Sequence, residues 1–270
     1  MADTADFWKS MESELFSQFG EESLSEVVPA SQIQPKTAGG RRILNIFFII
    51  DVSGSMRGMR IGQVNYAIEN IIKELRTRDD LNSVIKVAIM EFCNEATWKT
   101  PTPILIDDYV FTPIDTYPAY TCYGKAFDAL EVKLHKNGFM DPALGEYFAP
   151  LIMFVSDGEP TDFNEYPVAL EKLKKNKWFS KSSKYAIAVG EGAKTEKVGR
   201  ILEQFTGIRE NVRYADEGAG LCNLIEYIAI RASEVQTSLV SSSYGGGKEQ
   251  AQSIFNEVDN SLFSSIFGNQ

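Results

Sequence analysis

The chain has 270 residues and a formal net charge of −10 at pH 7, because 37 acidic residues outnumber 27 basic residues. This length suffices for one α/β domain of about 200 residues, with extensions. The negative charge argues against a nucleic-acid backbone as the main partner, since that requires a basic face. No apolar run approaches the roughly 20 residues of a membrane span, so we expect no membrane span.

The cysteines and the first residues bear on the cellular compartment. Cys93, Cys122 and Cys222 are an odd number of cysteines without a pairing pattern, which fits a reducing environment. Residues 1–6 are acidic and lack the charged and apolar regions of a signal peptide. We therefore expect a cytoplasmic protein.

A buried strand followed by oxygen-bearing side chains is the most informative feature of the sequence. The β-branched and aromatic run over residues 43–50 is typical of a fully buried strand. Asp51 follows where open α/β sheets place ligands, and Ser53 and Ser55 follow at alternate positions. These oxygens suit a hard cation such as Mg²⁺. A helix N-cap is the alternative interpretation, although it accounts for only one of the three residues.

The next segments alternate between helix and strand patterns. Apolar residues at helical spacing predict a helix over residues 61–76. The pattern over residues 84–93 predicts a strand. Two prolines within residues 96–106 are typical of an edge strand, and a loop is expected over residues 107–120.

A second apolar run ends in an aspartate. Residues 151–156 predict another buried strand, and Asp157 and a glycine follow it. If the two strands are neighbours where the strand order reverses, both carboxylates face one crevice. Asp-Gly is equally common as a simple turn, so this pair alone is not decisive. Helices are predicted on either side, over residues 126–135 and 165–178.

The same alternation continues through the rest of the centre. It predicts strands over residues 185–189 and 211–214, and helices over residues 194–205 and 218–238. Repeated strand–helix units predict an α/β fold. The sheet should be doubly wound and mainly parallel, with helices on both faces and an antiparallel edge strand.

Amphipathic segments flank the predicted domain. Apolar residues repeat at helical spacing over residues 5–19 and 250–267, which predicts two helices joined by polar linkers. The chain should thus comprise an N-terminal segment and linker (1–40), a domain (41–240), and a linker with a C-terminal helix (241–270). The two helices either complete the core of the domain or fit a groove on a partner.

Three motifs together resemble the metal-ion-dependent adhesion site of von Willebrand factor A domains. The first is Asp51, Ser53 and Ser55; the second is Thr121 in a Thr-x-x-Gly-x-Ala pattern; the third is Asp157 before a glycine. The glycines that usually precede the threonine are replaced in this chain. The resemblance implies a Rossmann-like fold and an ion, Mg²⁺ or alternatively Mn²⁺ or Ca²⁺, held by these five residues. The aspartates would contribute directly or through water.

The resemblance also implies a function. In such a domain the ion recruits an Asp or Glu of a protein partner, and no reaction is catalysed. The residues after Asp157 and the expected lack of a signal peptide resemble the bacterial intracellular branch of this family, which includes tellurite-resistance-associated proteins. That branch implies partners such as a kinase, a phosphatase or an AAA+ ATPase, in a stress-response or assembly system.

Two other functions remain open. A phosphotransferase or phosphatase could use Asp51 as a nucleophile beside Mg²⁺. Such haloacid-dehalogenase-type enzymes carry a second aspartate as general acid, and Ser53 replaces it here. A structural von Willebrand factor A domain would hold the ion without contacting a partner through it. His135 is the sole histidine and is expected at the surface, so no Ser-His-Asp triad is available.

Overall fold

A sheet of seven strands forms the centre of the computed structural model, which describes residues 41–77, 83–215, 225 and 229. The strands are β1 (Arg42–Asp51), β2 (Ser83–Phe92), β3 (Ala96–Trp98), β4 (Ile104–Leu105), β5 (Leu151–Ser156), β6 (Ser183–Val189) and β7 (Val212–Ala215). Their order is β3-β2-β1-β5-β6-β7, and β4 also pairs with β2. Strands β2, β1, β5, β6 and β7 are parallel, whereas β3 and β4 run antiparallel to β2.

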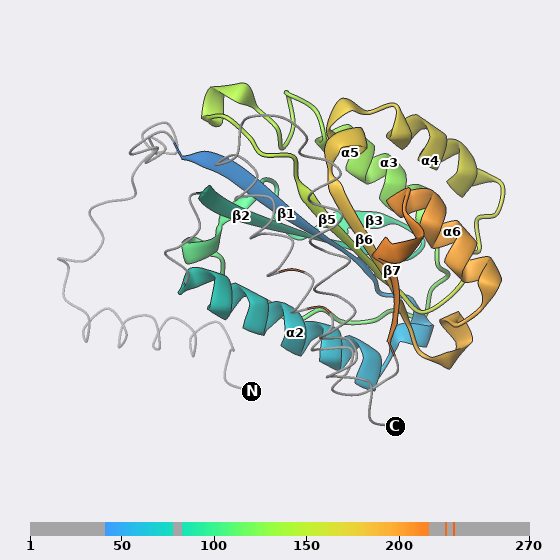
Figure 1. The fold of residues 1–270 in the computed structure, drawn as a ribbon. Coiled ribbons are helices and arrows are strands. Elements are labelled where there is room, and N and C mark those ends of the chain that lie inside the picture. Colours follow the sequence, from blue (N-terminus) through green and yellow to red (C-terminus); the bar gives the residue numbers. More distant parts are fainter. Residues whose placement is uncertain (1–40, 78–82, 216–224, 226–228, 230–270) are drawn as a thin grey trace, which may run out of the picture. The chain divides into compact units, whose positions relative to one another are not determined.

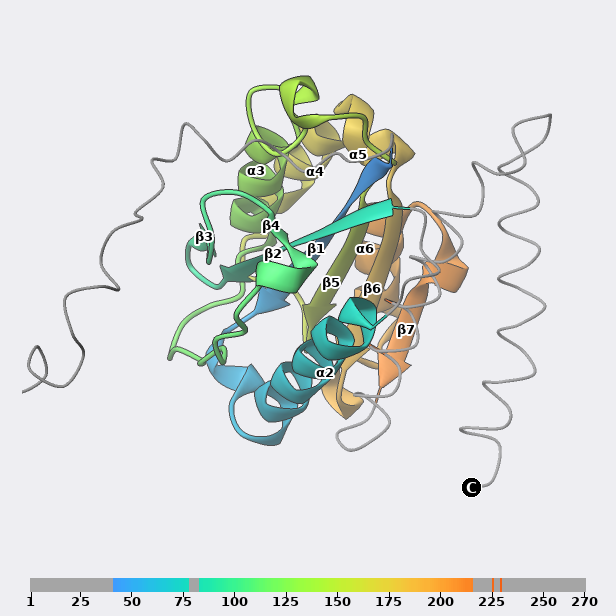
Figure 2. The ribbon, with the colours of Figure 1, turned by 90° about the vertical axis from the view of Figure 1, so that its left-hand side faces the viewer.

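Helices cover both faces of this sheet. In Figure 1, α2 lies below the sheet, and α3, α4, α5 and α6 lie above it; Figure 2 shows the same two layers from the side. The predicted fold class, with its antiparallel edge strand, is therefore confirmed. The helices are α2 (Met59–Arg76), α3 (Tyr123–Lys133), α4 (Glu165–Lys174), α5 (Lys177–Lys181) and α6 (Glu196–Thr206).

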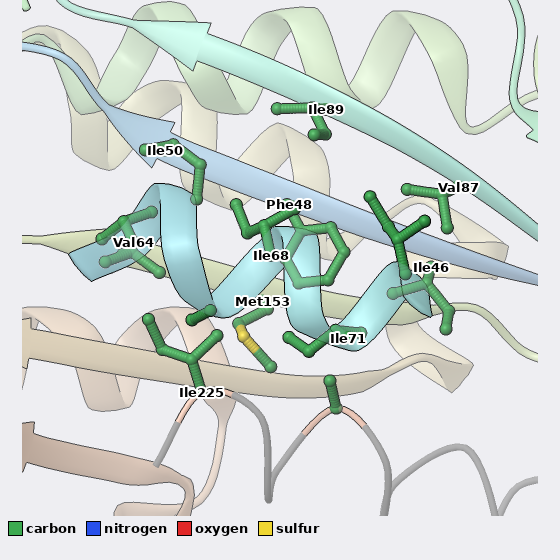
Figure 3. Close-up of a cluster of buried hydrophobic side chains, with 14 of the residues drawn as sticks. Ile46, Phe48, Ile50, Val64, Ile68, Ile71, Val87, Ile89, Met153 and Ile225 are labelled. Carbon is green, nitrogen blue, oxygen red and sulfur yellow. The ribbon is translucent and has the colours of Figure 1, made fainter. Parts of the chain in front are cut away.

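The two faces of β1 contribute to two separate clusters of buried side chains. Phe48 and Ile50 pack with Val64 of α2 (Figure 3). Phe47 and Ile49 belong to the cluster that α3, α4 and α6 complete on the opposite face. Because both faces of the strand are covered, its sequence is a continuous apolar run and does not alternate with polar residues.

The strand order reverses at β1. The chain passes from β1 to β2 on one side and later returns to β5 on the other side. Ile50 of β1 pairs with Val155 of β5, so the carboxyl ends of these two strands meet. The sheet therefore provides the crevice that was expected to hold the two aspartates.

The predicted helix over residues 165–178 is wrong as a single element. Helix α4 ends at Lys174, and α5 begins at Lys177. The Asn176 side chain accepts hydrogen bonds from the backbone N–H groups of Trp178 and Phe179. It thereby caps α5, which starts a new helix at this point.

The predicted helix over residues 126–135 is shifted toward the N-terminus. Helix α3 begins at Tyr123 and ends at Lys133, so His135 lies beyond it. Asp162 provides the reason for the early start, because its carboxylate accepts from the N–H groups of Tyr123 and Gly124 at 3.0 and 2.7 Å. The cap thus comes from a distant loop.

Some of the sequence predictions concern residues that the structure does not describe. The helices predicted over residues 5–19 and 250–267, and the linkers that should bound the domain, lie outside the described residues. Ile225 and Ala229 are the described residues of the helix predicted over 218–238; both are helical and fully buried. Within the described segments, no helix has the length and apolar character needed to cross a membrane.

Replacing Phe154 by alanine should lower the free energy of unfolding by about 3–5 kcal/mol, because a large side chain would leave a cavity. Phe154 is fully buried, and its ring lies 5.1 Å from the rings of both Phe92 and Phe205. Urea denaturation measures the loss. The matched control is Phe163→Ala, at a side chain that is 54% exposed, for which we expect a change below about 0.5 kcal/mol. Equal losses would contradict the position of Phe154 in the core.

Candidate metal centre

Asp51 occupies the carboxyl end of β1 and is fully buried. Its Oδ1 accepts a hydrogen bond from the Ser53 backbone N–H at 2.8 Å. Its Oδ2 accepts from the Ser156 hydroxyl, at the end of the neighbouring strand, at 2.6 Å. Both carboxylate oxygens are thus held in place before any ion binds.

Hydroxyl groups connect the two aspartate loops. The Oγ atoms of Ser53 and Ser55 lie 3.1 Å apart. The Ser55 hydroxyl donates to Asp157 Oδ1 at 2.8 Å, across 102 positions of sequence. Ser53 and Asp157 are buried whereas Ser55 is exposed, so solvent reaches the site at Ser55. The structure therefore brings the first and third predicted motifs into direct contact.

Thr121 lies on a loop that is attached to both aspartate loops. The Tyr117 N–H donates to the carbonyl of Val52, beside the first motif, at 2.8 Å. The Thr161 N–H donates to the carbonyl of Thr121, beside the third motif, at 2.8 Å. Thr121 is 7% exposed, and the structure records no hydrogen bond from its hydroxyl to another described residue. That hydroxyl is available as a ligand.

The residues Arg60, Ser156 and Tyr123 also shape the site, and the sequence analysis did not identify them. Arg60 of α2 donates to Asp157 Oδ2 at 2.5 Å and to the Ser55 carbonyl at 3.0 Å. The Tyr123 hydroxyl donates to the carbonyl of Gly158 at 2.8 Å and supports the loop after Asp157. A serine at a strand end gives a weak sequence signal, whereas nothing in the sequence shows that Arg60 turns back toward the loop.

The donor set fits a hard divalent cation. The hydroxyls of Ser53 and Ser55 and the carboxylate of Asp157 lie in contact, and Asp51 is next to them in the chain. These groups, with the Thr121 hydroxyl as a further candidate, are oxygen donors of the kind that Mg²⁺ accepts when water or a ligand completes its shell. The described residues contain no group of three or more His, Cys, Asp or Glu side chains placed to hold a metal. A cation at this site would therefore need hydroxyl ligands besides the two carboxylates.

Burial disfavours the ionised form of the Asp51 carboxyl relative to the protonated form. Burial raises the pKa of this carboxyl from 3.8 to about 6, and the nearby charge of Asp157 adds to the effect. Hydrogen bonds from Ser156 and Ser53 oppose the shift by stabilising the ionised form. A bound cation would favour the ionised form further, because it supplies an opposite charge beside the carboxylate.

His135 lies at the surface, as expected. Its side chain is 55% exposed and its Nε2 lies 2.8 Å from Glu131 Oε1. Among the described cysteines, Cys93 and Cys122 are free and partly buried. Neither His135 nor these two described cysteines contribute a side chain to the oxygen cluster.

Asp51→Asn should stabilise the metal-free protein at neutral pH and should lose this advantage in acid. The folded-state pKa of Asp51 is raised from 3.8 to about 6. The folded protein therefore prefers the protonated carboxyl, and the stability that this form contributes is complete below pH 3.8. It is lost as the pH rises through about 6. Asparagine resembles the protonated side chain at every pH. The difference in unfolding free energy should therefore grow by roughly 3 kcal/mol between about pH 4 and pH 7.

Urea denaturation of both proteins in a chelator measures this difference. Asp107→Asn is a suitable control, since Asp107 is exposed and outside the site. A difference between Asp51→Asn and wild type that does not vary with pH would contradict the raised pKa.

Parts of the chain are similar to known proteins. No protein-family model matches the chain. Inter alpha-trypsin inhibitor heavy chain 4 of Mus musculus is 26% identical over 132 residues, which cover 47% of this chain and 13% of that protein. The pilus adhesin SpaC of Lactobacillus rhamnosus GG aligns with a TM-score of 0.57 and 11% identity, over 72% of this chain and 31% of SpaC.

A mussel byssus protein gives a further match. Proximal thread matrix protein 1, in a structure with a zinc-occupied MIDAS motif, aligns with a TM-score of 0.50 and 15% identity, over 70% of this chain and 48% of that one. The chain thus spans less than half the length of each of these relatives. The similarity to the tellurite-resistance branch stays a prediction. The structural likeness, with the strand order and the site at its reversal, confirms that the chain has the fold of a von Willebrand factor A domain.

Proposed function

We propose that the chain is a non-catalytic interaction module that binds one Mg²⁺ and, through that ion, an Asp or Glu of a protein partner. The ligands would be Asp51, Ser53, Ser55, Thr121 and Asp157, with the aspartates acting directly or through water. The observation that carries the proposal is the continuous contact from Ser53 to Ser55 to Asp157, at 3.1 and 2.8 Å, across the strand reversal. Mn²⁺ and Ca²⁺ accept the same oxygen donors and are the alternative ions.

The charge balance of the site explains why an external carboxylate would bind. The cluster offers two carboxylates, and Arg60 already neutralises part of the charge on Asp157. The remaining ligands are neutral hydroxyls. A divalent ion held by them keeps a net positive charge and an open position, which a carboxylate from a partner can fill.

The geometry supports binding over phosphoryl transfer. A nucleophilic aspartate must reach its substrate, but Asp51 is fully buried and both of its oxygens accept hydrogen bonds. Ser53, where the haloacid-dehalogenase pattern requires a general acid, contributes a hydroxyl to the cluster. A phosphotransferase that uses Asp51 is therefore the weaker hypothesis.

The surroundings of Thr121 can accommodate a partner. A cleft of about 570 Å³ beside it is lined by Tyr120, Cys122, Thr161 and other residues of the same loops. Tyr120 is 71% exposed and Phe163 is 54% exposed. Exposed aromatic side chains around a polar centre are typical of protein interaction surfaces.

The finer parts of this proposal rest on the sequence alone. A kinase, phosphatase or AAA+ ATPase as partner, a bacterial stress-response or assembly system, and a cytoplasmic location follow from the resemblance described above. A structural domain whose ion contacts no partner is distinguished by the partner experiment below.

Calorimetric titration with Mg²⁺ should show one binding site in the wild-type protein and no detectable binding in Asp51→Ala, because that change removes a buried anionic ligand. The matched control is Asp128→Ala, since the Asp128 side chain is 55% exposed and pairs with Lys172. This variant should bind like wild type. Undiminished binding in Asp51→Ala would exclude the proposed site.

Thr121→Ala should weaken binding of a co-purified partner at least tenfold, since the ion would lose one ligand beside the interface. A chelator should have the same effect on wild type. Thr102→Ala, an exposed threonine outside the site, is the control, and circular dichroism checks the fold. Equal partner affinity with and without chelator would assign the site a structural role.

A further inference from the structure

Arg60 links the metal centre to the first turn of α2. Its Nη1 donates to Asp157 Oδ2 at 2.5 Å and also to the Ser55 carbonyl at 3.0 Å. The Ser55 hydroxyl donates to the other oxygen of the same carboxylate, Asp157 Oδ1. The two oxygens of Asp157 are therefore divided: Oδ1 faces the hydroxyl cluster, and Oδ2 faces the guanidinium.

Burial makes this ion pair more consequential than one on the surface. The Asp157 side chain is 2% exposed and the Arg60 side chain is 24% exposed. A buried carboxylate requires an opposite charge and hydrogen bonds, because water cannot solvate it. Among the described residues, Arg60 supplies this opposite charge, through its salt bridge with Asp157.

The end of β6 leaves room for the guanidinium. Gly190 follows β6 with φ of 81°, and a Cβ there would lie 2.9 Å from Arg60 Nη2. A side chain at this position would therefore press on the guanidinium as well as strain the backbone. The absence of a side chain at Gly190 therefore leaves space beside the guanidinium that contacts Asp157.

We infer that Arg60 is a built-in counter-cation of the metal centre. It neutralises Asp157 when the ion is absent, and it shares that carboxylate with the ion when the ion is bound. This inference rests on the proposed function. Arg60 acts through Asp157 and is a positioning residue, since it contacts Asp157 Oδ2 and the Ser55 carbonyl.

Two consequences follow from a shared carboxylate. The metal-free domain keeps its fold, because Asp157 is not left as an unpaired buried charge. The positive charge of Arg60 also opposes the ion, so the affinity for Mg²⁺ is lower than the same ligands would give without it. Arg60 and the ion are therefore thermodynamically coupled: each should stabilise the protein less when the other is present.

The experiment compares wild type with Arg60→Gln, which removes the charge and keeps a hydrogen-bond donor, and with Arg60→Lys, which keeps the charge. Arg57→Gln is the matched control, because Arg57 is exposed and lies just before α2. Melting temperatures are measured in chelator and in saturating Mg²⁺, and Mg²⁺ affinity is measured by calorimetry.

We expect Arg60→Gln to lower the melting temperature in chelator by several degrees and to approach wild type in Mg²⁺. By the same coupling, its Mg²⁺ affinity should rise about tenfold. Arg60→Lys and Arg57→Gln should remain near wild type. In chelator and in an Asp157→Asn background, Arg60→Gln should cause no further loss, because the charge that it compensates is gone.

Equal losses of melting temperature with and without Mg²⁺ would show that Arg60 only supports the fold, and would overturn the inference. Additive effects of Arg60→Gln and Asp157→Asn would overturn it as well. A wild-type protein that binds no Mg²⁺ would instead refute the proposed function, and with it the sharing of Asp157. The wild-type titration separates these two failures.

Discussion

The parallel pairing of β1 with β5 is the constraint on which the rest of this structure depends. The register places Ile50 opposite Val155, so Asp51 ends beside Ser156 and accepts its hydroxyl at 2.6 Å. A shift of one residue would turn every side chain of β1 to the opposite face and separate the two aspartate loops. The two apolar clusters on the faces of the sheet hold the register, and the position of the site follows from it.

Burial of charge then determines how the site behaves. Asp51 has a raised pKa because its carboxylate is removed from water, and Asp157 is almost as enclosed. The protein offsets this cost with serine hydroxyls, with a backbone N–H and with Arg60. These groups suffice to hold the carboxylates in position but leave the cluster able to gain from a further cation. This property is what the proposed ion-dependent contact with a partner would require.

The local pattern predicted most elements, and the exceptions have identifiable causes. Continuous apolar runs predicted β1 and β5 because helices cover both faces of the sheet. The break between α4 and α5 depends on Asn176, whose type is equally compatible with a surface position on one long helix. The early start of α3 depends on Asp162, which lies 39 positions from Tyr123. Caps from distant loops leave no periodic signal.

The sequence by itself determined the chemical character of the candidate site: Asp51, Ser53 and Ser55 follow a buried strand, and Asp157 follows another. Residue type and spacing decide this because strand ends and tight turns are local features. Only the tertiary structure decided that Ser55 contacts Asp157, that Ser156 holds Asp51 and that Arg60 turns back onto the site. These contacts join positions about a hundred residues apart, and their distances depend on strand register and helix packing.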